Sequence, residues 1–149
     1  MPAEYLKKLR EPGQRVNPLF QFLGVKVERL SPEQVVLVLP CREDFLQGGG
    51  VIAGGVMATL ADEAMAHLIL ANLDEGQSTA TIEMNLRFLN PIQKGKLFAE
   101  AALVKKGRQV FTVEAKIRDG QGRLLAQAGA SFMVKETGGG GRKKQASKP

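Results

Sequence analysis

The stretch GGVMATLADEAMAHLILANL, residues 54–73, decides the fold. It holds no proline, no glycine after Gly55 and many strong helix formers, which together predict a helix of about 18 residues. Apolar residues occur on nearly every side of this helix, so we expect it to be buried inside the domain. A single buried helix needs apolar cover on most sides, and a strongly curved antiparallel sheet would supply that cover.

The flanking sequence supplies the strands of such a sheet. Upstream, a Ser-Pro-Glu turn separates two apolar segments, which predicts a hairpin with an internal second strand. Downstream, alternating segments joined by short links predict antiparallel strands. We expect six strands, at residues 24–30, 35–39, 80–88, 97–104, 110–118 and 124–134. Strict alternation in the third strand puts Ala80, Ile82, Met84, Leu86 and Phe88 on one face and Thr81, Glu83, Asn85 and Arg87 on the other. The predicted class is α+β.

Length and charge limit the organisation of the chain. Its 149 residues suffice for one domain, expected at residues 1–136, with a helical extension at 1–23 whose second helix has Asn17 as its N-cap. The formal net charge is +6, but Arg142, Lys143, Lys144 and Lys148 all lie in the Gly-rich end. Without these four, 17 basic residues face 15 acidic ones, a balance of +2. We therefore expect residues 137–149 to form a disordered basic tail that does not bind nucleic acid, although contact with an anionic surface stays open.

Several classes of protein are disfavoured by what the sequence lacks. The longest apolar stretch, residues 56–71, is interrupted by polar side chains, so no membrane span is expected. The polar first residues do not resemble a secretory signal. Cys41 is the only cysteine, which leaves neither an internal disulfide nor a thiolate metal site. We expect a cytoplasmic protein.

Asp62 and Glu63 are chemical anomalies inside the apolar helix, because burying an unpaired carboxylate is costly. Two structural explanations stay open: their stripe is the solvent edge of the helix, or Asp62 pairs with a basic strand residue. The functional interpretation starts from Gly55, two turns earlier on the same face, near free backbone N–H groups. Those groups can hold a carbonyl oxygen while a carboxylate activates water, which suits acyl transfer. Glu63, about 100° further round the helix, fits a surface or interface position.

From Leu46 to Val134 the chain resembles the PaaI-like hotdog thioesterases, which hydrolyse acyl- or aryl-CoA esters. The helix-start signature of that family is His-Gly-Gly, a small or apolar run and an acidic residue; residues 53–62 here read AGGVMATLAD. The resemblance implies the hotdog fold, a curved sheet wrapped around one long central helix. It also implies that Asp62 is the general base or nucleophile, and that the N–H groups of Gly54 and Gly55 polarise the thioester carbonyl.

The resemblance implies further site residues. Gln47 stands where an amide side chain helps to place the nucleophilic water, and Thr81 matches a Ser or Thr that assists the acid. The CoA part of the substrate would contact a strand end and a turn: Phe88, Asn90, Pro91, Lys105, Lys106, Gly107 and Arg108. Taken singly, the basic residues of that turn could equally form a solvated hairpin tip. No separate cofactor and no metal are implied.

One position departs from the family pattern: the usual histidine is Ala53. This change could lower activity, shift substrate choice or mark a protein that binds acyl-CoA without hydrolysing it. A hotdog hydratase or dehydratase is a weaker alternative, because that chemistry normally needs a histidine near the helix start. His67, the sole histidine, lies more than three turns away and is interpreted as a surface or subunit-contact residue.

The resemblance also implies a homodimer, commonly assembled as a dimer of dimers. In the family the active site lies between two subunits, with the amide and the glycines from one and the acid from its partner. An oligomer would also cover the exposed sheet edges. The acyl group and the choice between general-base and nucleophilic catalysis stay open.

Overall fold

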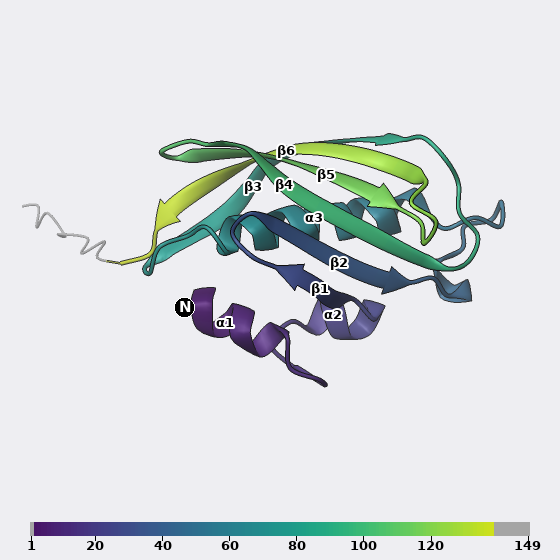
Figure 1. Ribbon diagram of the computed structural model, residues 1–149, viewed down its shortest axis with the longest axis horizontal. Helices are drawn as coiled ribbons and strands as arrows, with labels where there is room; N and C mark the ends of the chain where they lie inside the picture. Colours follow the sequence, from purple (N-terminus) through teal and green to yellow (C-terminus); the bar gives the residue numbers. More distant parts are fainter. Residues whose placement is uncertain (1, 139–149) are drawn as a thin grey trace, which may run out of the picture.

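The computed structural model describes residues 2–138 (Figure 1). Most of the expected basic tail therefore lies outside the described residues. The elements are α1 (Pro2–Leu9), α2 (Pro18–Leu23), β1 (Lys26–Leu30), β2 (Gln34–Pro40), a short 3-10 helix η1 (Glu43–Phe45), α3 (Gly54–Leu70), β3 (Gln77–Phe88), β4 (Lys96–Lys106), β5 (Val110–Arg118) and β6 (Leu124–Glu136).

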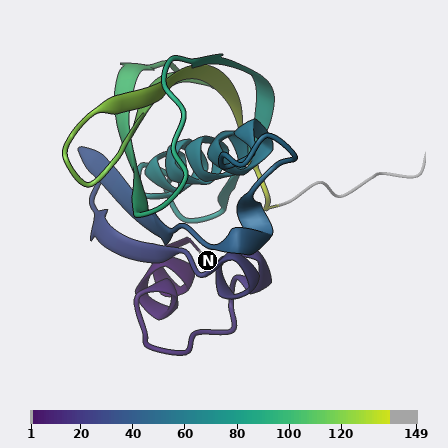
Figure 2. The ribbon, with the colours of Figure 1, turned by 90° about the vertical axis from the view of Figure 1, so that its right-hand side faces the viewer.

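The six strands form one antiparallel sheet in the order β1-β2-β4-β5-β6-β3. Viewed along α3, the sheet curves around this helix, as expected for the hotdog fold (Figure 2). The predicted internal position of the second strand is confirmed, because β2 pairs with both β1 and β4. The two edges of the sheet are β1 and β3.

The core lies between α3 and the inner face of the sheet. The predicted burial of α3 is confirmed by side chains that are almost inaccessible on several sides of the helix, including Leu60, Ala64, Met65 and Leu68. Along β5 the inward-facing residues are Phe111, Val113, Ala115 and Ile117, each at most 4% exposed. No helix in the described part of the chain is long and apolar enough to cross a membrane.

Strand β3 departs from the strict alternation expected of it. Its pairing with β6 shifts register between Thr81 and Glu83, so that Ile82 is an extra residue, a β-bulge. Paired residues on neighbouring strands share a face, and Thr81 pairs with the buried Phe132. Thr81 therefore faces α3 together with Met84, and the prediction that Thr81 lies on the opposite face from Met84 is wrong.

The N-terminal extension consists of the two expected helices. Asn17 is the N-cap of α2, as predicted: its side-chain oxygen accepts a hydrogen bond from the Phe20 N–H at 3.1 Å. Leu9 of α1 and Phe20 of α2 are buried at 4% and 2% exposure. Both helices lie beside β1, on the side of the molecule away from β5 and β6 (Figures 1 and 2).

Candidate active site

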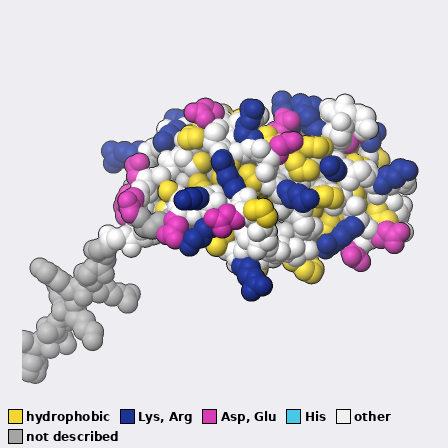
Figure 3. All heavy atoms as spheres, turned by 60° about the horizontal axis from the view of Figure 1, so that its bottom comes forward, with side chains coloured by type: hydrophobic (Ala, Val, Ile, Leu, Met, Phe, Trp, Pro, Cys, Tyr) yellow, Lys and Arg dark blue, Asp and Glu magenta, His cyan; other side chains and the backbone are white. Residues whose placement is uncertain are grey.

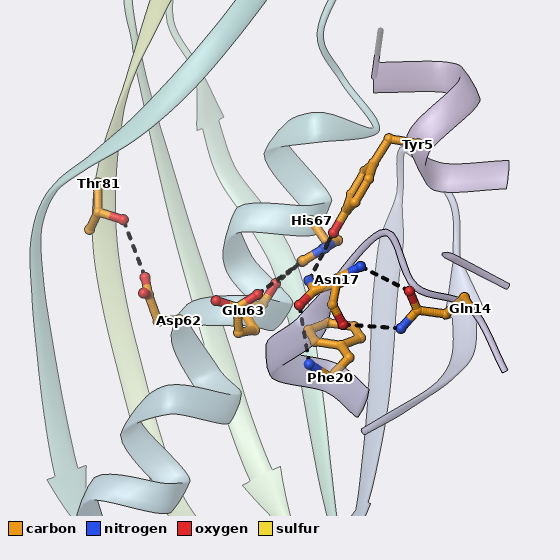
Figure 4. A network of polar contacts seen from close by, with 8 residues as sticks. All are labelled: Tyr5, Gln14, Asn17, Phe20, Asp62, Glu63, His67 and Thr81. Atoms are coloured by element: carbon orange, nitrogen blue, oxygen red, sulfur yellow. Dashed lines mark hydrogen bonds and ion pairs between the residues drawn. The ribbon is translucent and has the colours of Figure 1, made fainter. Parts of the chain in front are cut away.

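Asp62 points from α3 toward the edge strand β3 (Figure 4). Its carboxylate is half-buried, and Thr81 donates a hydrogen bond from Oγ1 to Asp62 Oδ1 at 3.3 Å. The bulge at Ile82 makes this contact possible, because it turns Thr81 toward the helix. Within residues 2–138 Asp62 forms no ion pair, so pairing with a basic strand residue does not explain it. The Asp62 carboxylate therefore lies at the unpaired edge of the sheet without a basic partner among the described residues.

At the start of α3 the helix backbone packs closely against an aromatic ring. Ala53, the N-cap residue, makes no side-chain hydrogen bond to the helix, so the first N–H groups receive no side-chain acceptor from it. The ring of Phe88, at the end of β3, lies over Gly54: a Cβ on Gly54 would be 2.8 Å from the ring. Gly54 is therefore required by this packing. The structure thus brings the sequence-predicted residues Phe88 and Gly54 together.

The loop before α3 folds back on itself. Gln47 donates its N–H to the Val51 carbonyl at 2.8 Å, and the Gly50 N–H bonds to the Gln47 carbonyl at 2.9 Å. The Gln47 side-chain oxygen accepts from the Gly49 N–H, so in the single chain this amide is engaged locally. The Ala53 N–H bonds to the Phe45 carbonyl at 2.8 Å and fastens the loop to the start of α3. Gln47 and Gly54 therefore belong to one connected unit.

One chain does not bring all of the expected catalytic groups to one point. Seven residues separate Gly55 from Asp62 along α3, which corresponds to roughly 10 Å of helix rise. A carbonyl held at the helix start would lie beyond the reach of the Asp62 carboxylate of the same chain. The geometry of the single chain therefore divides the expected site into two half-sites, one around Gly54 and one around Asp62.

The expected coenzyme contacts also fall into two groups, at opposite ends of the sheet (Figure 1). Lys106, before the β4–β5 turn, lies in one cross-strand row with Phe111, Phe132 and Thr81. Phe88 lies in another row with Ala126 and Ile117. Six residues along β5 separate the two rows, which corresponds to roughly 20 Å. In one subunit, the turn at 105–108 is thus at the Asp62 end and Phe88 is at the Gly54 end.

His67 is buried inside the subunit, and the prediction of a surface or subunit-contact position is wrong. It is 2% exposed, packed against Tyr5 and Phe20 of the N-terminal helices. Its Nδ1 lies 2.6 Å from the Glu63 carbonyl, which can only accept, so Nδ1 carries the proton and Nε2 accepts from Tyr5 Oη at 2.9 Å (Figure 4). Burial lowers the pKa of His67, which favours this neutral form.

Glu63 lies on the same covered side of α3, half-buried near the N-terminal extension. Its carboxylate is 3.7 Å from His67 Nδ1. Burial, followed by the negative charge of Asp62, raises the pKa of Glu63. The expected surface or interface position is therefore wrong in part, since α1 and α2 restrict access to this side chain.

Comparison with known proteins places these features in a family. Residues 49–126 match the family model of the thioesterase superfamily. This match spans the end of the loop before α3, the whole of α3 and the strands β3, β4 and β5. The chain belongs to the thioesterase superfamily. A "Putative esterase" of Saccharolobus solfataricus is 30% identical over 89% of this chain and 94% of its own length.

Two solved structures of this superfamily are close in shape. A "putative thioesterase, phenylacetic acid degradation-related protein" from Ralstonia eutropha is 30% identical, covers 87% of this chain and 98% of its own, and has a TM-score of 0.78. A thioesterase family protein from Silicibacter pomeroyi is 27% identical, with 89% and 98% covered and a TM-score of 0.78. The resemblance to phenylacetate-degradation-type hotdog proteins is confirmed at the level of family and fold.

Proposed function

We propose that this protein hydrolyses an acyl- or aryl-CoA thioester to the free acid and CoA, with Asp62 as the acidic catalytic residue. One observation carries the proposal: a half-buried carboxylate on an apolar helix faces an open sheet edge, and among residues 2–138 its side-chain hydrogen-bond partner is the Thr81 hydroxyl. Such a group is costly to retain without a role. Membership of a thioesterase superfamily supports the same reaction class.

In the proposed mechanism the thioester carbonyl oxygen binds the N–H groups of Gly54 and Gly55, where negative charge develops in the transition state. Asp62 of the other subunit either takes a proton from water, which attacks the carbonyl carbon, or attacks it directly to give a mixed anhydride that water then cleaves. In both routes the C–S bond breaks and the CoA thiolate leaves, to be protonated. Gln47 positions the water, and Thr81 orients the carboxylate.

The proposal requires a homodimer that joins the two half-sites. Strand β3 offers a free edge of 12 residues. Antiparallel pairing of two β3 strands about a two-fold axis at Asn85 would set Phe88, three residues on, opposite the Thr81–Ile82 bulge of the partner. Phe88 covers Gly54, and Thr81 bonds Asp62, so this pairing would bring each Asp62 to the partner's helix start.

A cysteine cross-link tests this dimer. We expect Asn85→Cys in a Cys41→Ser background to form a disulfide-linked dimer on mild oxidation, because each new cysteine would face its own copy across the axis. The control is Lys26→Cys in the same background, on the opposite edge strand β1. Non-reducing electrophoresis would show cross-linking of the first variant only; equal cross-linking of both, or of neither, contradicts the β3 pairing.

The reaction itself is tested by thiol release from a panel of acyl- and aryl-CoA esters. Wild-type release that disappears in Asp62→Asn supports hydrolysis. The rival function, acyl-CoA binding without turnover, is favoured by Ala53, which stands where the family has histidine. Binding of a CoA ester by the wild type without any thiol release would establish that rival.

A further inference from the structure

A groove of about 550 Å³ lies outside both half-sites, between the β3–β4 connection and the β5–β6 turn. Pro91, Lys94 and Lys96 line one wall, Arg123 lines the other, and Val51 also contributes. The groove is at the end of the molecule where α3 begins. The Ile52 N–H, one residue after Val51, bonds to the Ile92 carbonyl at 2.8 Å and ties the loop before α3 to this wall.

Arg123 and Asp119 fix the two walls relative to each other. The Asp119 side-chain oxygen accepts from the N–H groups of Gln121 and Arg123 at 3.0 and 2.9 Å, which closes the turn. These bonds, that of Arg123 first, lower the pKa of Asp119 and keep it ionised. Arg123 Nη2 then donates across the groove to the Pro91 carbonyl at 2.7 Å. This hydrogen bond links the two walls of the groove.

The charge of the groove is positive. Asp119 Oδ2 lies 3.3 Å from Arg123 Nε, so these two charges offset each other. Lys94 and Lys96 are exposed, and within residues 2–138 neither forms an ion pair. Two ammonium groups without a partner, on the rim of one groove, favour a ligand that carries more than one negative charge.

We propose that this groove binds the phosphate groups at the nucleotide end of CoA. The inference rests on the proposed function, and it places those phosphates at residues 94–96, whereas the family resemblance implied the turn at 105–108. Phe88 covers Gly54 and is followed after two residues by Pro91, in the groove wall. A CoA thioester held at Gly54 would therefore extend along Phe88 into the groove of the same subunit. The turn at 105–108 lies at the far end of that subunit, and the partner's copy of this turn, which the proposed dimer would bring to the Gly54 end, is the competing position for the phosphates.

Binding measurements that need no turnover test the inference. The dissociation constants of CoA, 3′-dephospho-CoA, pantetheine and inorganic phosphate are measured by calorimetry at low and high salt. The variants are Lys94→Ala with Lys96→Ala, Lys105→Ala with Lys106→Ala, and, as a control of equal charge loss, Lys7→Ala with Lys26→Ala. Kinetic assays on the same proteins separate KM from kcat, and a spectroscopic melting curve shows that each is folded.

We expect the Lys94/Lys96 variant to bind CoA about tenfold more weakly, with a smaller salt dependence and an unchanged affinity for pantetheine. For the wild type, we expect dephospho-CoA to bind less tightly than CoA, and inorganic phosphate to bind weakest of the ligands tested. The inference is overturned if the Lys94/Lys96 variant binds CoA like the wild type, or if only the Lys105/Lys106 variant is weakened. Wild-type hydrolysis with unaffected CoA affinity in the Lys94/Lys96 variant would leave the proposed function standing and refute the groove alone. If CoA binding depends on Lys94 and Lys96 but no ester is hydrolysed, the groove proposal stands and the proposed function is refuted.

Discussion

Asp62 and Glu63 are neighbours in sequence and opposites in setting. Asp62 faces the edge strand β3 and bonds to one hydroxyl, while Glu63 faces the N-terminal helices beside a buried histidine (Figure 4). Both are half-buried carboxylates on the same apolar helix. The difference arises because consecutive residues on a helix point about 100° apart, and the two directions are covered unequally. On the Asp62 side, the unpaired edge of the sheet leaves α3 accessible. On the Glu63 side, α1 and α2 cover the helix.

Exposed apolar side chains occur both on the N-terminal extension, where Phe22 of α2 is 71% exposed, and along β3; what distinguishes β3 is its unpaired strand edge. Figure 3, which brings the side of the N-terminal helices forward, shows basic and acidic side chains interspersed with apolar ones. Among the exposed apolar side chains, Ile82, Phe88 and Leu89 belong to β3 or follow it directly, at 51%, 57% and 49% exposure. An open edge that also carries apolar side chains is suited to a partner subunit. The contrast predicts that the rate of hydrolysis depends on Asp62, and that the free energy of unfolding depends on the residues around Glu63 and His67.

The largest expected effect separates the two carboxylates directly. Asp62→Asn should lower kcat for CoA-ester hydrolysis by roughly a thousandfold or more, because the amide can neither take a proton nor attack. Glu63→Gln, the matched change one residue along, should retain activity to within about tenfold. Steady-state kinetics on one preferred ester measures both. Equal losses in the two variants would contradict the division of roles.

The next effect concerns the contribution to stability of the side of α3 that the N-terminal helices cover. His67→Ala should destabilise the fold by about 2–4 kcal/mol, because it leaves a cavity beside Phe20 and removes the acceptor of the Tyr5 hydroxyl. Urea unfolding measures the free energy. Asp62→Asn serves as the control and should change stability by less than about 1 kcal/mol. A larger loss in the control than in His67→Ala would refute the contrast.

A smaller effect is expected at Thr81. Thr81→Val keeps the branched shape on the strand but removes the hydroxyl that bonds Asp62, so kcat should fall by about tenfold. Thr81→Ser keeps the hydroxyl and should restore most of the activity. If valine is as active as the wild type, or serine as poor as valine, the hydroxyl does not orient the carboxylate.

The smallest effect is a pH dependence of stability. The pKa of His67 is lowered in the folded state, so below its ordinary value of 6.5 the unfolded chain binds the proton more readily. Stability should therefore decrease as the pH falls from 6.5 toward the folded pKa. The pKa of Glu63 is raised from 4.5, so protonation of Glu63 opposes this loss at lower pH.

The measurement compares urea unfolding at pH 7.5 and 5.5 for the wild type and His67→Gln. The wild type should lose up to about 1 kcal/mol more than the variant over this interval. An identical pH dependence in both proteins would show that His67 does not titrate differently on unfolding.

Local sequence predicted most of the fold. The helix expected from residue 54 begins at Gly54, the Asn17 cap forms, and strand β5 covers the expected residues 110–118. Each of these depends on periodicity or on a cap within a few residues. The family and the hotdog arrangement followed from the motif at 53–62 together with the strands around it, and both are confirmed.

Other features depend on contacts that no local pattern records. His67 is buried because Tyr5 and Phe20, more than 40 residues away, cover it. The alternating pattern did not predict the bulge at Ile82, because an extra apolar residue in an edge strand cannot be distinguished in sequence from an inward-facing apolar residue of a regular strand. Lys94 and Lys96 gave no signal, because only the folded chain sets them beside the turn at 119–123. The roles of Asp62, Gln47 and the glycines remain predictions.

The bulge in β3 divides the strand into two segments of opposite parity. Up to Thr81, odd-numbered positions face α3; beyond Ile82, even-numbered ones do. Ile82 therefore acts as a spacer whose presence matters more than its side chain. Replacing it by another residue leaves both segments in phase with the helix, whereas deleting it would force one segment to turn its inward-facing residues outward. The number of residues in β3 is thus more constrained here than the identity of the side chain at position 82.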